Sequence, residues 1–276
     1  MPYSLTSEQV ASYEQQGILF PIAVLQDEEV SHFRSGYDDL IAAFDHKPKS
    51  TELGVTHLHF RWAWDLVTHP KVLNAVEGVL GPDLLVWASS IFVKPPSDPS
   101  YISFHQDGTY WGLDSTLVTT AWIALSPSTI KSGCMRVAPG TQRDSIHPHE
   151  ETWAEDNLLS RGQEIQVDIA DKDVVDVVLQ PGEMSLHHVN IIHGSGRNVS
   201  NEPRIGFAVR YIDPQVKQTA PGHPVIVARG KDRYGHYDHM TEPPPKMNVT
   251  EALSKHLAAA EIHAREILST QAANEE

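Results

Sequence analysis

Residues 84–94 read LLVWASSIFVK, a run rich in β-branched and aromatic residues that is typical of a strand. It opens a series of similar short runs separated by turn residues. The later runs are YISFHQ, LVTTAWIAL, GCMRVAP, EIQVDIA, DVVDVVL, EMSLHH and RIGFAVRYI. About eight strands at this spacing favour a sandwich or barrel over alternating β-α units. The sequence therefore predicts a mainly β fold with its core in residues 83–213.

Helices are predicted on both sides of this core. Thr6 and Gln9 form a capping-box pattern ahead of VASYEQQ. Two further helical stretches, DEEVSHFRSGYDDLIAAFD and HPKVLNAVEGVLG, make residues 1–82 a mostly helical flank. Residues 214–276 form a C-terminal extension, and its Ala-rich stretch from 249 to 269 predicts one more helix. With 276 residues the chain is near the upper limit for one hydrophobic core, so a single domain is expected.

The amino-acid composition indicates which partners the protein can bind and in which cellular compartment it is expected. Lysine and arginine number 21 against 36 acidic residues, a net charge of −15 without a basic cluster, which argues against nucleic-acid binding. Cys134 is the single cysteine, so neither an internal disulfide nor a thiolate metal site is expected. The first residues lack the pattern of a signal peptide, and no apolar run approaches the roughly 20 residues of a membrane span. We therefore expect a cytoplasmic protein with a small-molecule substrate and no membrane partner; its oligomeric state stays open.

The stretch SFHQDGTYWGL, residues 103–113, sets His105 and Asp107 two positions apart where a strand ends. Two residues apart on a strand means the same face, so the pair forms either half of a metal site or a surface salt bridge. Sixteen histidines make chance pairs common, and the chain contains a second one, His236 and Asp238.

His193 distinguishes the first pair from the second. It ends the apolar part of HHVNIIHGSGRN, 86 residues after Asp107 and ahead of a glycine-rich turn. Two imidazoles and one carboxylate on one face of an octahedron leave three coordination positions open, as in non-haem Fe(II) oxygenases. His236 and Asp238 have no such completion, so we interpret them as structural.

Arg204 follows His193 by eleven residues and begins the run RIGFAVRYI. From a neighbouring strand it could bind the far carboxylate of 2-oxoglutarate bidentately, with Ser195 adding a hydrogen bond, while the keto-acid end of 2-oxoglutarate chelates iron. The alternative is an ordinary surface arginine, and spacing alone leaves both possibilities open.

Between Leu84 and Ile212 the chain resembles the phytanoyl-CoA dioxygenase (PhyH-like) family of Fe(II)/2-oxoglutarate oxygenases. The resemblance rests on four motifs in order: FVKPPSD, HQDGTYWGL, SGCMRVAPGTQ and HGSGRNVSNEPR. It implies a double-stranded β-helix, a jelly-roll and cupin-like core, between the flanking helices. It also implies the residue roles: His105, Asp107 and His193 as iron ligands, Arg204 and Ser195 on the C5 carboxylate of 2-oxoglutarate, and Lys94 as a further cofactor contact.

The reaction expected from this resemblance is hydroxylation of a C–H bond with release of succinate and CO₂. Its cofactors would be Fe(II), 2-oxoglutarate and O₂, with ascorbate as the reductant in vitro. Halogenases of the superfamily carry Ala or Gly in place of the metal-binding carboxylate, so Asp107 favours oxygenation. The alternatives are a halogenase-like enzyme of the same superfamily, a cupin-like metal-binding protein without redox activity, and a zinc hydrolase on the same barrel.

Four residues are candidates for the substrate pocket. His188 is interpreted as a substrate or supporting contact or as a packed histidine, whereas neighbouring His187 is expected to point the other way. Tyr110 and Trp111 follow the metal motif directly and belong to either the core or the pocket. Arg136, a departure from the family pattern, could meet an anionic group, as could Arg197. An acyl-CoA would want a basic surface, so a small polar metabolite is favoured: an amino acid, a phosphonate or a natural-product intermediate.

Overall fold

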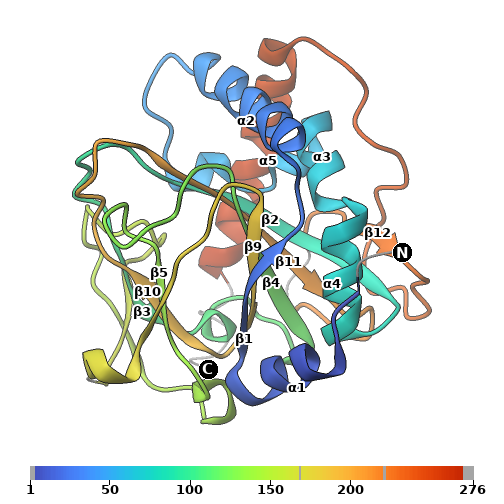
Figure 1. Ribbon diagram of the computed structural model, residues 1–276. Coiled ribbons are helices and arrows are strands. Elements are labelled where there is room, and N and C mark those ends of the chain that lie inside the picture. Colours follow the sequence, from blue (N-terminus) through green and yellow to red (C-terminus); the bar gives the residue numbers. More distant parts are fainter. Residues whose placement is uncertain (1–3, 168, 220–221, 270–276) are drawn as a thin grey trace.

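The computed structural model describes residues 4–167, 169–219 and 222–269, and it contains two antiparallel sheets that face each other (Figure 1). The larger sheet has the order β1 (Ile18–Ala23), β9 (Glu183–His188), β4 (Val118–Ala124), β11 (Arg204–Ile212), β2 (Leu84–Lys94) and β12 (Ile226–Arg229). The smaller sheet has the order β3 (Ile102–His105), β10 (Ile192–Ser195), β5 (Met135–Ala138) and β8 (Val175–Val177). A hairpin of β6 (His149–Glu151) and β7 (Gln163–Ile165) lies beside them. The predicted mainly β, jelly-roll core is confirmed.

Helices cover the larger sheet on the side away from the smaller one (Figure 1). They are α2 (Asp27–Ala42), α3 (Arg61–Val67), α4 (Pro70–Leu80) and α5 (Val249–Ser269), with α1 (Ser7–Gln16) at the end of β1. Short 3₁₀ helices are η1 (Ser50–Leu53), η2 (Thr56–Leu58), η3 (Asp107–Thr109), η4 (Thr141–Arg143) and η5 (Asp171–Asp173). Among the helices of the described residues, none is long and apolar enough to cross a membrane.

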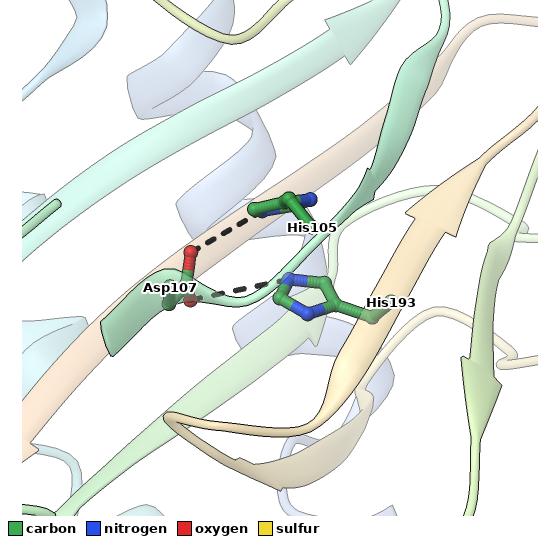
Figure 2. Close-up of side chains that lie close together, drawn as sticks. All are labelled: His105, Asp107 and His193. Carbon is green, nitrogen blue, oxygen red and sulfur yellow. Dashed lines mark ion pairs between the residues drawn. The ribbon is translucent and has the colours of Figure 1, made fainter. Parts of the chain in front are cut away.

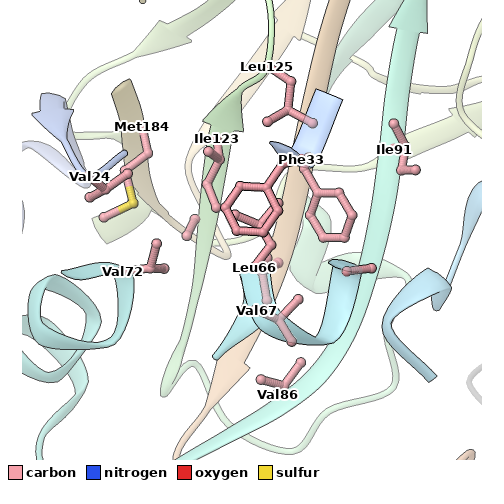
Figure 3. Close-up of a cluster of buried hydrophobic side chains, with 14 of the residues drawn as sticks. Val24, Phe33, Leu66, Val67, Val72, Val86, Ile91, Ile123, Leu125 and Met184 are labelled. Atoms are coloured by element: carbon pink, nitrogen blue, oxygen red, sulfur yellow. The ribbon is translucent and has the colours of Figure 1, made fainter. Parts of the chain in front are cut away.

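The period-two alternation of β11 separates the core from the cavity between the sheets. Its odd-numbered residues, Ile205 to Tyr211, join the buried cluster beneath the helices. There they meet side chains of the other strands and of α2 and α3, including Phe33, Ile123 and Leu66 (Figure 3). The even-numbered residues of β11 therefore face the smaller sheet.

The helical flank begins as the sequence predicts. The Thr6 hydroxyl accepts the backbone N–H of Gln9, and the Gln9 side chain accepts the backbone N–H of Thr6, which completes the capping box. Four strands, β1, β6, β10 and β12, lie outside the predicted runs. β1 supplies an edge to the larger sheet from within the N-terminal flank, and β12 supplies the other edge from the C-terminal extension.

Candidate metal centre

Strand register brings the two predicted histidine ligands together. β3 and β10 pair antiparallel with His193 directly opposite His105. β3 ends at His105, but Gln106 keeps extended backbone angles, so the alternation continues and returns Asp107 to the side of His105. Asp107 then opens η3. The following Gly108 leaves room for the Asn190 side chain, because a Cβ there would lie 2.3 Å from its oxygen.

The three side chains converge on one point (Figure 2). Asp107 lies between the imidazoles, with Oδ1 3.3 Å from His105 Nε2 and Oδ2 3.9 Å from His193 Nε2. One ligand atom of each residue lies within 4.8 Å of the other two, and all three residues are buried. Two imidazole nitrogens and one carboxylate oxygen form the donor set of the facial triad, and these residues fit a divalent iron ion.

Backbone carbonyls fix the orientation of both histidines. His105 Nδ1 donates to the Ser103 carbonyl at 2.9 Å, and His193 Nδ1 donates to the Ile191 carbonyl at 3.0 Å. In each ring the proton is thereby held on Nδ1 and the Nε2 lone pair is directed at the centre. The neutral tautomer that a metal requires is already selected.

The local electrostatics favour an ionised Asp107 carboxylate beside a neutral His193 imidazole. Burial would raise the pKa of Asp107, but the hydrogen bond with His105 and the charges of His193 and Arg210 outweigh it and hold that pKa below its usual range. Burial, and then His105, lower the pKa of His193 to about 4. Ligands in these protonation states release no proton when a cation binds at neutral pH.

His236 and Asp238 form no comparable centre. Asp238 is exposed, and the described residues bring only His105, Asp107 and His193 within metal-binding distance of one another. The His236 ring instead lies 5.6 Å from that of Tyr234. The structural interpretation of this pair agrees with its position.

The predicted co-substrate residues form a buried polar cluster beside the triad. Arg204 on β11 pairs in register with Lys94 on β2, and both side chains are almost fully buried. Lys94 Nζ donates to Ser195 Oγ at 2.6 Å and also contacts the Gly196 carbonyl. Arg204 donates one guanidinium N–H to the Gly133 carbonyl at 3.0 Å and stacks on Trp122.

Arg204 retains unused hydrogen-bond donors in this cluster. The Arg204 Nε and second terminal nitrogen have no hydrogen-bond partner among the described residues, although both are buried. Burial, and then the charge of Arg204, lower the pKa of Lys94 to about 6. A buried guanidinium with spare donors is completed by an anion, and a carboxylate has the right geometry.

A cavity of about 1130 Å³, open solvent at its mouth included, connects the triad with Arg204 and Ser195. Tyr110 and Trp111 line it and also pack in a buried apolar cluster, so they belong to both pocket and core. Lys94 lies behind this lining, in contact with Ser195.

Two of the residues suggested for the substrate pocket lie outside the cavity lining. Arg136 is outside the lining and is neutralised by Asp171, at 2.9 Å, and Asp176, at 3.4 Å. His188 is also outside, and its Nδ1 accepts the backbone N–H of Asn190. Arg197, the other arginine considered, is exposed.

His187 takes the place expected for His188. On β9, Met184 and Leu186 face the helices, so the alternation turns His187 toward the cavity. Its ring lies 4.9 Å from that of His193. Burial, and then His193, lower the pKa of His187 well below its usual value, so it is a neutral neighbour of the triad.

Several pocket residues were not singled out from the sequence. Arg210 lies on the inner face of β11. His263 of α5 also lines the cavity, together with Ser50, Thr51, Gly54 and residues 158–160. The alternation of side chains along a strand could have identified Arg210. Arg204, Gly206, Ala208 and Arg210 are alternate residues of one strand and therefore share a face. No local motif marked His263.

The family model for phytanoyl-CoA dioxygenase (PhyH) matches residues 13–206. Human peroxisomal phytanoyl-CoA dioxygenase is 27% identical over 223 residues, covering 70% of this chain; the chain spans 64% of that enzyme's length. The 1-deoxypentalenic acid 11-beta-hydroxylase of Streptomyces arenae is 32% identical over 155 residues, covering 53% of this chain and 54% of the hydroxylase.

Among solved structures, the non-haem monooxygenase ThoJ matches with a TM-score of 0.80 and 31% identity, covering 95% of this chain and 98% of ThoJ. CytC3, solved with Fe(II) and alpha-ketoglutarate, matches with a TM-score of 0.67 over 90% of this chain and all of CytC3; at 20% identity it shares the fold. The ordered motifs, the buried triad and the extent of the family match lead to one conclusion: this chain belongs to the phytanoyl-CoA dioxygenase (PhyH) family.

Proposed function

We propose that this protein is an Fe(II)- and 2-oxoglutarate-dependent dioxygenase that hydroxylates a C–H bond of a small polar metabolite. Succinate and CO₂ would be the products of the co-substrate, O₂ the oxidant and ascorbate the reductant in vitro. A single cysteine suits a reducing compartment, and we propose a cytoplasmic location.

One observation carries the proposal: the buried triad opens into the same cavity as an arginine with unused donors. A metal-binding protein without redox chemistry, or a zinc hydrolase, would leave Arg204 without an anionic partner. An enzyme that uses a dicarboxylate co-substrate needs both features side by side. Their joint presence therefore supports oxygenase chemistry over the alternatives.

The chain's residues have distinct tasks in this reaction. His105, Asp107 and His193 would hold the iron, and the bound metal, 2-oxoglutarate and O₂ together supply the oxidising chemistry. Arg204 and Ser195 would orient 2-oxoglutarate through its far carboxylate, with Lys94 supporting Ser195. Tyr110 and Trp111 line the adjoining wall and exclude water from the place where the substrate C–H bond would lie.

Asp107 also bears on the type of product. A carboxylate ligand fills the coordination position that a halide ion would need, so we propose oxygenation rather than halogenation. In chloride or bromide buffer the native enzyme is expected to give oxygenated product only. Mass spectrometry would contradict this if a product carried the halide isotope pattern.

The test of the proposed function is conversion of 2-oxoglutarate to succinate by the Fe(II) protein with ascorbate, with a library of small metabolites as substrates. Succinate formation is expected to rise with a matching substrate and to disappear in His193→Ala. An Asp238→Ala variant is the control, because that exposed carboxylate lies in the second histidine–aspartate pair. If the Fe(II) protein neither binds nor consumes 2-oxoglutarate, the proposal fails.

A further inference from the structure

A second guanidinium lies in the cavity, on the same strand as Arg204. β11 presents its even-numbered residues to the cavity in the order Arg204, Gly206, Ala208 and Arg210. Arg210 lies six positions after Arg204 along the strand, so their Cα atoms are about 20 Å apart. The residues between them on this face, Gly206 and Ala208, are small, and the Trp122 ring packs over Gly206.

Arg210 is held in place without an acidic partner. One terminal guanidinium nitrogen donates to Ser90 Oγ at 2.7 Å. The guanidinium lies against two rings, 5.4 Å from the Trp111 centroid and 5.8 Å from the Phe92 centroid. Its Nε is buried and has no hydrogen-bond partner among the described residues. The cation is therefore oriented by aromatic contacts and retains an unused donor.

The two arginines act on different neighbours. Arg210 influences the pKa values of Asp107, His193 and His187, on the triad side of the cavity. Arg204 influences those of Lys94 and Cys134, at the proposed co-substrate end. 2-Oxoglutarate anchored at Arg204 would direct its other end to the triad, so the role of Arg210 is tested with 2-oxoglutarate already bound.

The charge of the cavity is opposite to that of the whole chain. The chain carries −15, yet the residues that line the cavity, all within the described ranges, include two arginines and a single acid, Asp107. A divalent metal ion and a 2-oxoglutarate dianion cancel each other. One positive charge remains in excess in the loaded cavity, and a buried excess charge is costly unless an anion pairs with it.

We infer that Arg210 is the anchor for an anionic group, a carboxylate, on the substrate, so that the substrate is a small monocarboxylate with an apolar or aromatic body. This inference rests on the proposed function, because it assigns the co-substrate to Arg204. Trp111 and Phe92 hold the guanidinium and contribute apolar surface to the wall beside it. Arg210 therefore takes the role that the sequence suggested for Arg136.

The alternative is that Arg210 only neutralises Asp107. In that case its removal would weaken metal binding and would not discriminate between charged and neutral ligands. A substrate anchor has the opposite signature: carboxylates lose affinity when Arg210 is replaced, whereas the corresponding amides do not. The two roles are therefore separated by comparing matched ligands.

The experiment uses calorimetric titration of protein loaded with Zn(II) and saturating 2-oxoglutarate, which occupies Arg204 without turnover. The probes are propionate, hexanoate and 3-phenylpropanoate, each paired with its neutral amide. Wild type is expected to bind at least one carboxylate more tightly than its amide. Arg210→Met should weaken that carboxylate by about 10- to 100-fold, the loss of a hydrogen-bonded charge pair, and leave the amide unchanged.

Two further variants make the result specific. Arg210→Lys keeps the charge and is expected to retain part of the preference for carboxylates. This variant also provides a test if Arg210→Met does not fold. Arg136→Met is the matched control, because Arg136 stacks on Phe104 outside the cavity lining, and it should bind as wild type does. The inference is overturned if wild type shows no preference for any carboxylate, or if Arg210→Met weakens Zn(II), carboxylate and amide alike.

Failure of the proposed function would show separately. The preceding titration of 2-oxoglutarate into the Zn(II) protein tests that function directly. If 2-oxoglutarate does not bind, the carboxylate titrations are repeated in Arg204→Met, where Arg204 cannot compete. A carboxylate preference that persists there, and is lost on adding Arg210→Met, still supports Arg210 as the anchor; its absence overturns the inference.

Discussion

At the scale of single residues, both metal-binding histidines use the same local device. Each donates its Nδ1 proton to the carbonyl two positions earlier, Ser103 for His105 and Ile191 for His193. The acceptors are backbone atoms of the histidines' own chain segments, so ring orientation does not depend on a distant side chain. The ligand geometry is therefore prepared before a metal arrives.

Removal of any one ligand is expected to abolish tight metal binding. Alanine in place of His105, Asp107 or His193 should weaken Fe(II) binding by more than about 100-fold, beyond the usual effect of changing a supporting residue. Anaerobic titration against a chelator measures the affinity. Asp238→Ala should bind as wild type does, and full Fe(II) affinity in His105→Ala would disprove the site.

Arg204 is expected to set the affinity for 2-oxoglutarate. Truncating a buried charge-assisted pair costs on the order of 2–5 kcal/mol, so Arg204→Ala should raise the 2-oxoglutarate dissociation constant by more than about tenfold. Calorimetry on the metal-loaded protein measures the constant, with Arg136→Ala as the surface control. An unchanged constant would move the co-substrate anchor to another residue.

Lys94 makes co-substrate binding depend on pH. Burial, and then Arg204, lower the pKa of Lys94 to about 6, so the amine is mainly neutral in the free protein at pH 7. A bound carboxylate favours the charged amine and raises this pKa. Binding then takes up a proton, and affinity falls as pH rises above about 6.

Calorimetry in two buffers of different ionisation enthalpy measures this uptake. Wild type should take up a fraction of a proton per 2-oxoglutarate bound at pH 7.5, and Lys94→Met should take up none. Uptake that is equal in the two proteins would show that another group titrates.

Residue-level prediction from the sequence succeeded where alternation and motif order agreed. His105 and Asp107 share a face because Gln106 stays extended, and His193 completes the centre that the sequence predicted. The choice between His187 and His188 failed because β9 is covered on both faces, so hydrophobicity does not reveal which histidine faces the cavity. The structure shows that His187, and not His188, lines the cavity.

At the scale of elements, β11 combines two functions on its two faces. One face packs against helices, and the other presents both arginines to the cavity. Gly206 makes this possible, because a Cβ at that position would lie 1.8 Å from the Trp122 ring. The ring that covers Gly206 also supports the guanidinium of Arg204.

Gly206→Ala is therefore expected to displace Trp122 and destabilise the sheet. Overpacking of this kind costs about 1–3 kcal/mol, and the melting temperature should fall by several degrees. Thermal unfolding measures the effect. Gly196→Ala is the control, since an added Cβ there meets nothing within 4 Å. Equal stability of the two variants would contradict the packing argument.

The runs rich in β-branched residues were predictable, whereas the two edge strands of the larger sheet were not. β2, β9 and β11 follow runs that the sequence marks clearly, whereas β1 contains Pro21 and β12 has only four residues. Both lie at the edges of the larger sheet, where pairing on one side suffices and proline is tolerated. Their place depends on partners more than 100 residues away, which local patterns do not report.

At the scale of the whole molecule, the charge of the surface opposes that of the cavity. A chain of −15 repels dianions at long range, whereas Arg204 attracts them only at short range. Entry of 2-oxoglutarate is therefore expected to be slowed by the protein's overall field. Salt screens that field more strongly than it screens the buried contact.

The association rate of 2-oxoglutarate should accordingly rise with ionic strength. Between about 20 mM and about 200 mM NaCl we expect a roughly two- to fivefold increase. Stopped-flow tryptophan fluorescence of the metal-loaded protein measures it, with a neutral diamide of glutaric acid as the ligand that salt should not affect. A rate that falls with salt would mean that the cavity's own field dominates entry.

The position of α5 has a consequence for how the protein matures on the ribosome. All three proposed metal ligands have been synthesised by His193, but His263 and Ala264, which also line the cavity, follow about 70 residues later. At usual translation rates this interval lasts roughly 4–14 s. Until α5 is made, the proposed metal site lacks the part of the cavity wall that this helix supplies, and we expect a metal ion to be able to enter before the helix packs in place.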